Sequence, residues 1–225
     1  MKRNKLGILG VLGTLGLVGS LGLNIFQYSQ NQKLAESNKV TNVVDGDTII
    51  IGGWQRIRLS NIEAPEINLC GGIEAKQYLE KMILGKNVTI VANTEDVFNR
   101  TLALVYVNNV LVNEALLKEG LVRYDGTPNS KRKILKKADD EAVANNRGIH
   151  EPPCFAEKPD NPKCLIKGNI TKNTTIKHYF FPGCSEYTAV FVEKNLGESW
   201  FCTEKEAQDA GFQKAQNCFN NVYKN

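Results

Sequence analysis

The sequence contains only two histidines, His150 and His178, and no Cys-x-x-Cys pair among its six cysteines. This scarcity argues against a multi-histidine metal site and a histidine general base, and the cysteine spacing argues against a zinc ribbon. With 42% hydrophobic and 23% charged residues over 225 positions, the chain should form one ordinary globular domain and a smaller module. The net charge of +4 only weakly indicates a polyanionic partner, because 24 acidic residues accompany 28 basic ones.

The N-terminus predicts a membrane anchor. Three basic residues within Met1–Lys5 precede an uncharged stretch, Leu6–Phe26, which is long enough to cross a bilayer as a helix. The basic cluster should stay in the cytoplasm and the rest of the chain outside it. No small-x-small cleavage site follows, so we expect residues 1–28 to be an uncleaved single-pass anchor in the cell membrane and residues 29–38 a polar stalk. The alternative is a secreted protein that has lost its signal peptide. Outside the cytoplasm, six cysteines predict three disulfides.

The next part of the chain predicts a small, mainly β barrel with helices packed on it. Strand and turn signals come first, and apolar residues at helical spacing follow. The expected elements are a hairpin of Thr48–Ile51 and Arg56–Ser60 around Gly52-Gly53, a helix over Ala75–Ile83 ended by Gly85, strands Val88–Val91 and Leu102–Val107, a helix over Asn113–Glu119, and a basic helix over Ser130–Asn146 with Leu135, Ala138 and Ala142 inward.

Prolines then indicate a linker, which we place at residues 155–163. Residues 164–225 hold four cysteines in a module too small to bury much surface, so we expect a disulfide-rich α+β unit. Within it, Thr203 and Glu206 form a capping-box pattern at the start of a short helix.

Two sequence elements concentrate acidic residues. Asp45 and Asp47 flank a glycine, and in an extended strand both project from one face, where a hard cation such as Ca²⁺ or Mg²⁺ would relieve their repulsion. Glu63 and Glu66 lie around Pro65 at the end of a strand that begins with Arg58. A third element, Asp96-Val-Phe-Asn-Arg100, places a second arginine before an apolar strand. Each element alone has an ordinary structural explanation, such as a turn tip or a surface ion pair.

In this order and at these intervals, the elements resemble the staphylococcal nuclease (thermonuclease) family. The matching segments are Asp45–Thr48, Arg58–Glu66, Asp96–Arg100 and Val112–Leu121. The resemblance implies an OB-type five-stranded barrel with three helices over residues 39–154. It also implies metal-dependent hydrolysis of DNA or RNA that prefers single strands and leaves 3′-phosphate ends.

The resemblance also assigns roles to individual residues. Glu66 would be the general base for the attacking water, and Arg58 and Arg100 would clamp the phosphate. Asp47, Glu63 and the backbone carbonyl of Ala64 would hold Ca²⁺, in preference to Mg²⁺, with Asp45 acting behind them. Two departures from the family pattern alter the site but remove no catalytic group: Glu63 replaces an aspartate, and Phe98 with Asn99 replaces Tyr-Gly.

The cysteine pairs are predicted in part from relatives. In exported relatives a cysteine before the first helix is joined to one after the last, which implies a Cys70–Cys154 bridge. The C-terminal module resembles the small Ada-type metal-binding fold, so its four cysteines could hold zinc. Their spacing and the oxidising compartment favour two bridges, and we expect Cys164–Cys202 and Cys184–Cys218.

Two other functions remain open. A nuclease fold can serve as a non-catalytic nucleic-acid-binding module, although the retained acids and arginines favour catalysis. A zinc-dependent surface adhesin governed by the C-terminal module would need bound zinc and would not depend on Glu66. We expect the chain to be a monomer.

Overall fold

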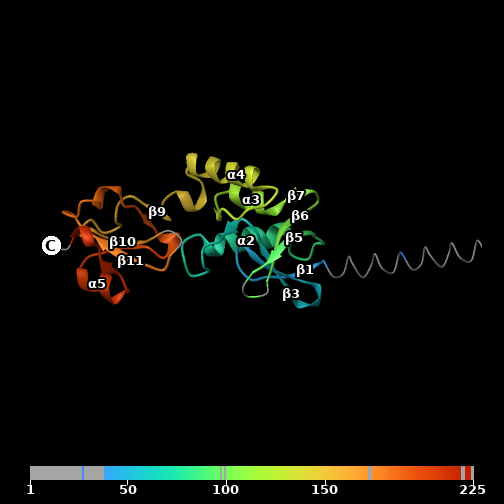
Figure 1. Cartoon of the computed structure of the whole chain (residues 1–225), viewed down its shortest axis with the longest axis horizontal. Helices are drawn as coiled ribbons and strands as arrows, with labels where there is room; N and C mark the ends of the chain where they lie inside the picture. Colours follow the sequence, from blue (N-terminus) through green and yellow to red (C-terminus); the bar gives the residue numbers. More distant parts are fainter. Residues whose placement is uncertain are drawn as a thin grey trace, which may run out of the picture.

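The computed structural model describes Gln27, residues 38–96, Phe98, and residues 100–171, 174–218 and 221–223. Its N-terminal part is a barrel, built from a sheet with the strand order β1-β2-β3-β6-β5 (Figure 1). The Val40 amide donates to the carbonyl of Lys86 at 2.9 Å, and the Val88 amide donates to that of Asn38 at 3.1 Å. These bonds join β1 to the segment entering β5 and close the sheet. The strands are β1 (Val40–Val43), β2 (Thr48–Ile51), β3 (Gln55–Leu59), β5 (Thr89–Glu95) and β6 (Thr101–Val107), with β7 (Val110–Leu111) added to β6.

Three helices cover the barrel: α2 (Gly72–Ile83), α3 (Val112–Lys118) and α4 (Arg132–Ala144). Figure 1 shows α3 between α4 and the strands. In α4, Leu135, Ala138 and Ala142 are buried, as their helical spacing predicted. The predicted hairpin and all three helices are confirmed, and the fold is the mainly β, OB-like one that we expected.

A buried asparagine holds β6 against α3. Asn113 is 0% exposed; its Oδ1 accepts the Val105 amide at 3.0 Å, and its Nδ2 donates to the carbonyls of Ser60 at 2.8 Å and Ala103 at 3.3 Å. Buried backbone groups left without partners would be costly. One side chain therefore satisfies three backbone groups where two strands and a helix meet.

A two-stranded ladder lies beside the barrel. β4 (Ile62–Glu63) pairs with β8 (Arg123–Tyr124), so that Ile62 lies opposite Tyr124 and Glu63 opposite Arg123. The segment between α3 and α4 is thereby placed against the end of the strand region that carries Glu63.

The C-terminal module has its own sheet, in the order β13-β10-β11-β14, and its own core around Tyr179 and Phe181. Phe155 and Ala156, in the segment expected to be a linker, form β9 and pair with β12. The elements are β9 (Phe155–Ala156), β10 (Ile166–Ile170), β11 (Lys177–Phe180), β12 (Val192–Glu193), β13 (Ser199–Phe201), α5 (Glu204–Asp209) and β14 (Gln213–Lys214). Short 3-10 turns are η1 (Gly52–Trp54), η2 (Gly148–His150), η3 (Tyr187–Ala189), η4 (Lys194–Leu196) and η5 (Gln216–Cys218).

The module contacts the barrel through polar groups as well. Arg123 Nη2 lies 2.7 Å from Glu193 Oε2 and donates to Asn195 Oδ1 at 3.2 Å, while the Lys194 amide donates to the carbonyl of Cys154 at 2.8 Å. The β9–β12 ladder and these contacts join the two cores directly.

All six cysteines are paired, as Cys70–Cys154, Cys164–Cys202 and Cys184–Cys218. The predicted pairing is confirmed, and no cysteine thiolate remains for a zinc ion in the C-terminal module. The capping pattern is confirmed in part: Thr203 Oγ1 accepts the Glu206 amide at 3.1 Å, but the Glu206 carboxylate accepts the amide of Cys202 rather than that of Thr203.

Within the described part of the chain, no helix is both long and apolar enough to cross a membrane. The expected anchor, residues 1–28, lies outside the described residues apart from Gln27.

Candidate active site

The Asp45-Gly46-Asp47 turn lies in close contact with two other segments. A Cβ atom on Gly46 would come within 2.6 Å of Ala75 Cβ on α2 and 2.8 Å of Ala64 Cβ after β4. Both distances are far below carbon–carbon contact at about 3.5–4.0 Å. Only glycine therefore lets this turn approach the chain that carries Glu63 and Ala64.

Asp47 contributes a buried carboxylate to the site, and only 3% of the residue is exposed. Its Oδ2 accepts the Ala64 amide at 2.8 Å, and its Oδ1 accepts the Thr48 hydroxyl at 2.9 Å and Arg58 Nη1 at 2.5 Å. Burial raises the pKa of the Asp47 carboxyl, while the Arg58 guanidinium and the Ala64 amide oppose the rise. Asp45 Oδ1 accepts the Asp47 amide at 3.1 Å and so fixes the turn rather than contacting Arg58.

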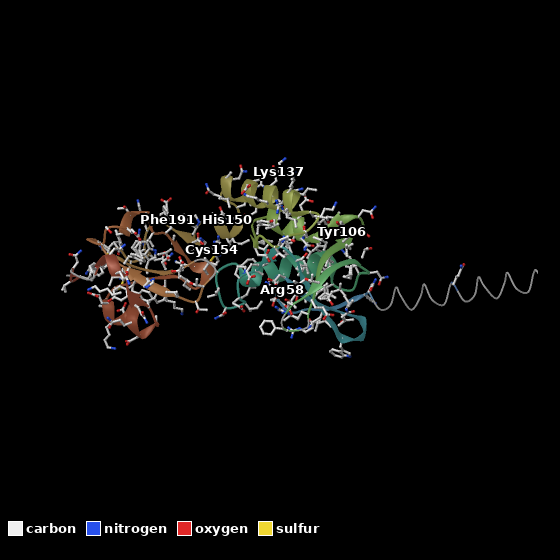
Figure 2. The ribbon with its side chains drawn as sticks, in the orientation of Figure 1. Arg58, Tyr106, Lys137, His150, Cys154 and Phe191 are labelled. Atoms are coloured by element: carbon white, nitrogen blue, oxygen red, sulfur yellow. A yellow bond between two sulfur atoms is a disulfide. The ribbon has the colours of Figure 1, made fainter. Side chains whose placement is uncertain are left out.

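Arg58 lies between two carboxylates. Besides its bond to Asp47, its Nη2 donates to Glu63 Oε2 at 2.6 Å. The Arg58 side chain is 16% exposed, whereas that of Glu63 is 60% exposed. One guanidinium thus contacts a buried acid and an exposed acid on the barrel surface, where Figure 2 labels Arg58.

The second arginine is positioned by an aspartate four residues earlier. Asp96 Oδ2 accepts Arg100 Nε at 2.6 Å, and its Oδ1 accepts the amides of Phe98 at 2.8 Å and Arg100 at 2.9 Å. These bonds lower the pKa of Asp96, against the effect of desolvation, which raises it. The Arg100 guanidinium carbon lies 5.3 Å from the centre of the exposed Phe98 ring. Asp96 contacts the guanidinium through Nε, and among the described residues neither Nη group has a hydrogen-bond partner, so both can serve a phosphate.

The sheet register places Arg58 beside the start of the strand that follows Arg100. β3 and β6 are parallel, with Ile57 opposite Thr101 and Arg58 opposite Leu102. Arg100 directly precedes β6, and its carbonyl accepts the Asp96 amide at 3.0 Å, next to the paired residues Glu95 and Thr101. Arg58 therefore lies on the strand next to the one that Arg100 directly precedes.

Glu66 follows this cluster in an exposed loop. The Leu69 amide donates to the Glu66 carbonyl at 2.8 Å, and a Cβ on Gly72 would come within 2.1 Å of that carbonyl oxygen. Gly72 therefore lets α2 begin directly against the loop. Among the described residues, the Glu66 carboxylate has no hydrogen-bond partner, which leaves it available to a water molecule.

The predicted metal ligands are only partly assembled. In the part of the chain that the structure describes, no three His, Cys, Asp or Glu side chains converge on one point. Asp47 and Glu63 instead share the Arg58 cation, and Ala64 contacts Asp47 through its amide. The donors still fit a hard divalent cation, because two carboxylates that already surround one positive charge are oxygen ligands of the kind that Ca²⁺ prefers.

Two contributions to the site escaped the sequence analysis. Asp96 was part of a motif but had no assigned role, although its spacing of four residues before Arg100 could have indicated an ion pair. Gly46 separates the two aspartates, but the need for glycine arises from α2 and Ala64, which lie far along the chain. That steric reason has no local sequence signal.

Comparison with known proteins agrees with this geometry. A family described as staphylococcal nuclease homologue matches residues 56–151. The thermonuclease of Staphylococcus intermedius is 34% identical over 139 residues, which cover 56% of this chain and 83% of that protein. The staphylococcal-like nuclease CAN1 of Arabidopsis thaliana is 33% identical over 139 residues, covering 52% of this chain and 42% of the plant protein. The chain thus spans less than half the length of this plant relative. The family match ends at residue 151, before the C-terminal module.

Proposed function

Because the chain belongs to the staphylococcal nuclease family, we propose that it is a metal-dependent nuclease that hydrolyses phosphodiester bonds of single-stranded DNA or RNA. The observation that carries this proposal is the contact of Arg58 with both Asp47 and Glu63, on the strand next to the one that Arg100 directly precedes. A dianionic transition state needs this combination of fixed positive charge and carboxylate ligands.

In this proposal each group has one task. Arg58 and Arg100 bind the phosphate oxygens, because a guanidinium fork matches two oxygens at once. Glu66 accepts a proton from the attacking water. Asp96 is a positioning residue that fixes Arg100 through its Nε, and Gly46 keeps Asp47 against the Ala64 amide.

Asp47, Glu63 and the Ala64 carbonyl would hold Ca²⁺, with Asp45 supporting them. A bound Ca²⁺ would supply charge neutralisation at the phosphate. Glu63 is one methylene longer than the family aspartate, which changes the reach of this ligand. The preference between Ca²⁺ and Mg²⁺ should therefore be measured. Two expectations stay part of the proposal: attachment to the cell membrane through residues 1–28, with secretion as the alternative, and a monomeric state.

The experiment compares the full-length protein on single-stranded DNA with Ca²⁺, with EDTA, and as the Arg58→Ala and Glu66→Gln variants. We expect EDTA to abolish cleavage and each substitution to lower kcat by at least about 100-fold. Equal activity in all four conditions would refute the mechanism. Binding without cleavage by the unaltered protein would instead favour the non-catalytic binding module.

A further inference from the structure

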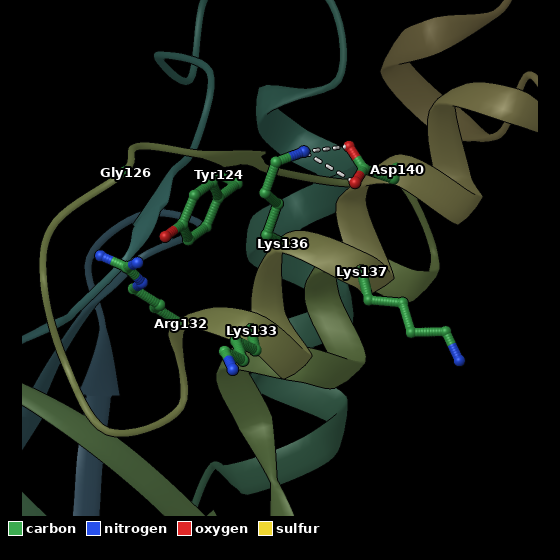
Figure 3. A pocket seen from close by; sticks show the side chains of 7 residues that line it. All are labelled: Tyr124, Gly126, Arg132, Lys133, Lys136, Lys137 and Asp140. Atoms are coloured by element: carbon green, nitrogen blue, oxygen red, sulfur yellow. Dashed lines mark hydrogen bonds and ion pairs between the residues drawn. The ribbon is translucent and has the colours of Figure 1, made fainter.

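A second basic feature lies outside the residues of the candidate active site. A pocket of about 360 Å³ opens between α4 and the chain that follows β8 (Figure 3). We call it the basic groove and define it by the lining residues Tyr124, Arg132, Lys133, Lys136, Lys137 and Asp140. Four of these six side chains are cationic and one is anionic. In Figure 3, Arg132 extends toward the Tyr124 hydroxyl, whereas Lys137 points away.

Partners on the protein neutralise only part of this charge. Lys136 Nζ lies 2.7 Å from each carboxylate oxygen of Asp140, and Lys137 Nζ lies 3.5 Å from Glu141. Arg132 and Lys133 are exposed, and within the described residues neither side chain has an ion-pair partner. These two cations are therefore the ones that an anionic ligand would neutralise.

Helix stability does not explain their location. The first turn of α4 contains no acidic residue, and its N-cap residue Lys131 makes no side-chain capping bond. Cations in the first turn of a helix are disfavoured by the helix dipole, by about 0.3–1 kcal/mol each. The placement costs stability, as charges retained for binding often do.

The groove is directly connected to the candidate active site. Tyr124 lies opposite Ile62 in the β4–β8 ladder, one residue from the pair of Glu63 with Arg123. The Tyr124 amide donates to Asp139 Oδ1 at 3.1 Å, which ties α4 to the same ladder. The ladder therefore joins the strand that carries Glu63 to Tyr124, which lines the groove.

We propose that the basic groove binds the phosphodiester backbone of the substrate strand beyond the bond being cleaved, with Arg132 and Lys133 as the main contacts. This inference rests on the proposed nuclease function, because it assumes a nucleic-acid strand that runs from the candidate active site to the groove. It predicts that the protein prefers oligonucleotides over small diesters, because only a longer strand reaches the groove.

The test uses the full-length protein. The double variant Arg132→Gln/Lys133→Gln is compared with a control, Lys81→Gln/Lys163→Gln, which removes the same charge from exposed positions elsewhere. Binding of a twelve-nucleotide single strand is measured against salt concentration in the Glu66→Gln background. Each lost phosphate contact should reduce the slope of log K against log salt by about 0.7, hence by about 1.4 in the groove variant and not in the control.

Cleavage gives the second readout. The ratio of kcat/KM for the twelve-nucleotide strand to that for a nitrophenyl phosphodiester of one nucleotide should fall about tenfold at low salt in the groove variant. The groove proposal would be refuted if the salt slope and the kcat/KM ratio of the groove variant equal those of the control. It would also be refuted if the parent protein does not bind the strand. If the parent cleaves neither substrate but the slope still falls, the nuclease proposal fails and the groove stands.

Discussion

Gly46→Ala tests whether the site depends on close backbone packing. The added methyl would meet Ala75 Cβ at 2.6 Å and Ala64 Cβ at 2.8 Å, so the segments must separate by roughly 1 Å to restore normal contact. Overpacking of this kind costs about 1–3 kcal/mol of the free energy of unfolding. A separation of that size would also stretch the 2.8 Å bond between Asp47 Oδ2 and the Ala64 amide to roughly 3.8 Å, beyond hydrogen-bond range.

The expected activity loss is larger than the stability loss. A displacement of about 1 Å at reacting groups can cost about 100-fold in rate. We therefore expect kcat/KM on single-stranded DNA to fall about 100-fold in Gly46→Ala, while denaturant unfolding still shows a cooperative transition. Adding Ala75→Gly removes the closer contact and should recover part of the activity.

Gly85→Ala is the matched control. Gly85 has a φ of 74°, and a Cβ there meets no atom within 4 Å, so the substitution should cost about 1–2 kcal/mol of stability and leave kcat/KM unchanged. If Gly46→Ala keeps both the stability and the activity of the parent protein, the steric argument is wrong. Equal activity losses in Gly46→Ala and Gly85→Ala would refute it as well.

Three other predictions follow from the contacts described. Asp96→Asn keeps acceptors for the two amides but loses the ion pair with Arg100, so kcat/KM should fall at least tenfold with an unchanged melting temperature and circular dichroism spectrum. Replacing Cys70 and Cys154 by serine opens a loop with a sequence separation of 84 and should lower the free energy of unfolding by about 4–5 kcal/mol, measured in denaturant. Burial raises the pKa of Glu198 from 4.5 to about 7, so the stability it contributes is full below pH 4.5 and is lost as the pH rises to about 7; Glu198→Gln should flatten this part of the stability–pH curve.

Local patterns were enough to predict most of the barrel. The hairpin of β2 and β3 and the buried face of α4 follow from spacings of two and of three to four residues, which secondary structure imposes directly. The ladder between β4 and β8 had no such signal, since two residues on each side make too short a pattern. The sequence did not predict the pairing of β9 with β12, because the prolines and polar residues around β9 are typical of a linker.

The candidate site was predictable as a set of residues but not as a set of contacts. Carboxylates and arginines in family order identified Asp47, Arg58 and Glu63, which the structure brings together. The sequence could not show that Arg58 would bridge both acids, because that contact depends on the turn at Gly46 meeting Ala64. For the same reason Glu66 could be named but not placed in contact with the others.

The contacts of Arg123 make the C-terminal module part of the mechanical support of the nuclease domain. The backbone of this residue pairs with Glu63, while its guanidinium is held by Glu193 and Asn195 of the module. Removing everything after residue 163 would leave a half-buried arginine without its acid beside one of the proposed metal ligands. A protein shortened in this way is expected to bind the proposed Ca²⁺ less tightly, even though every proposed ligand would still be present.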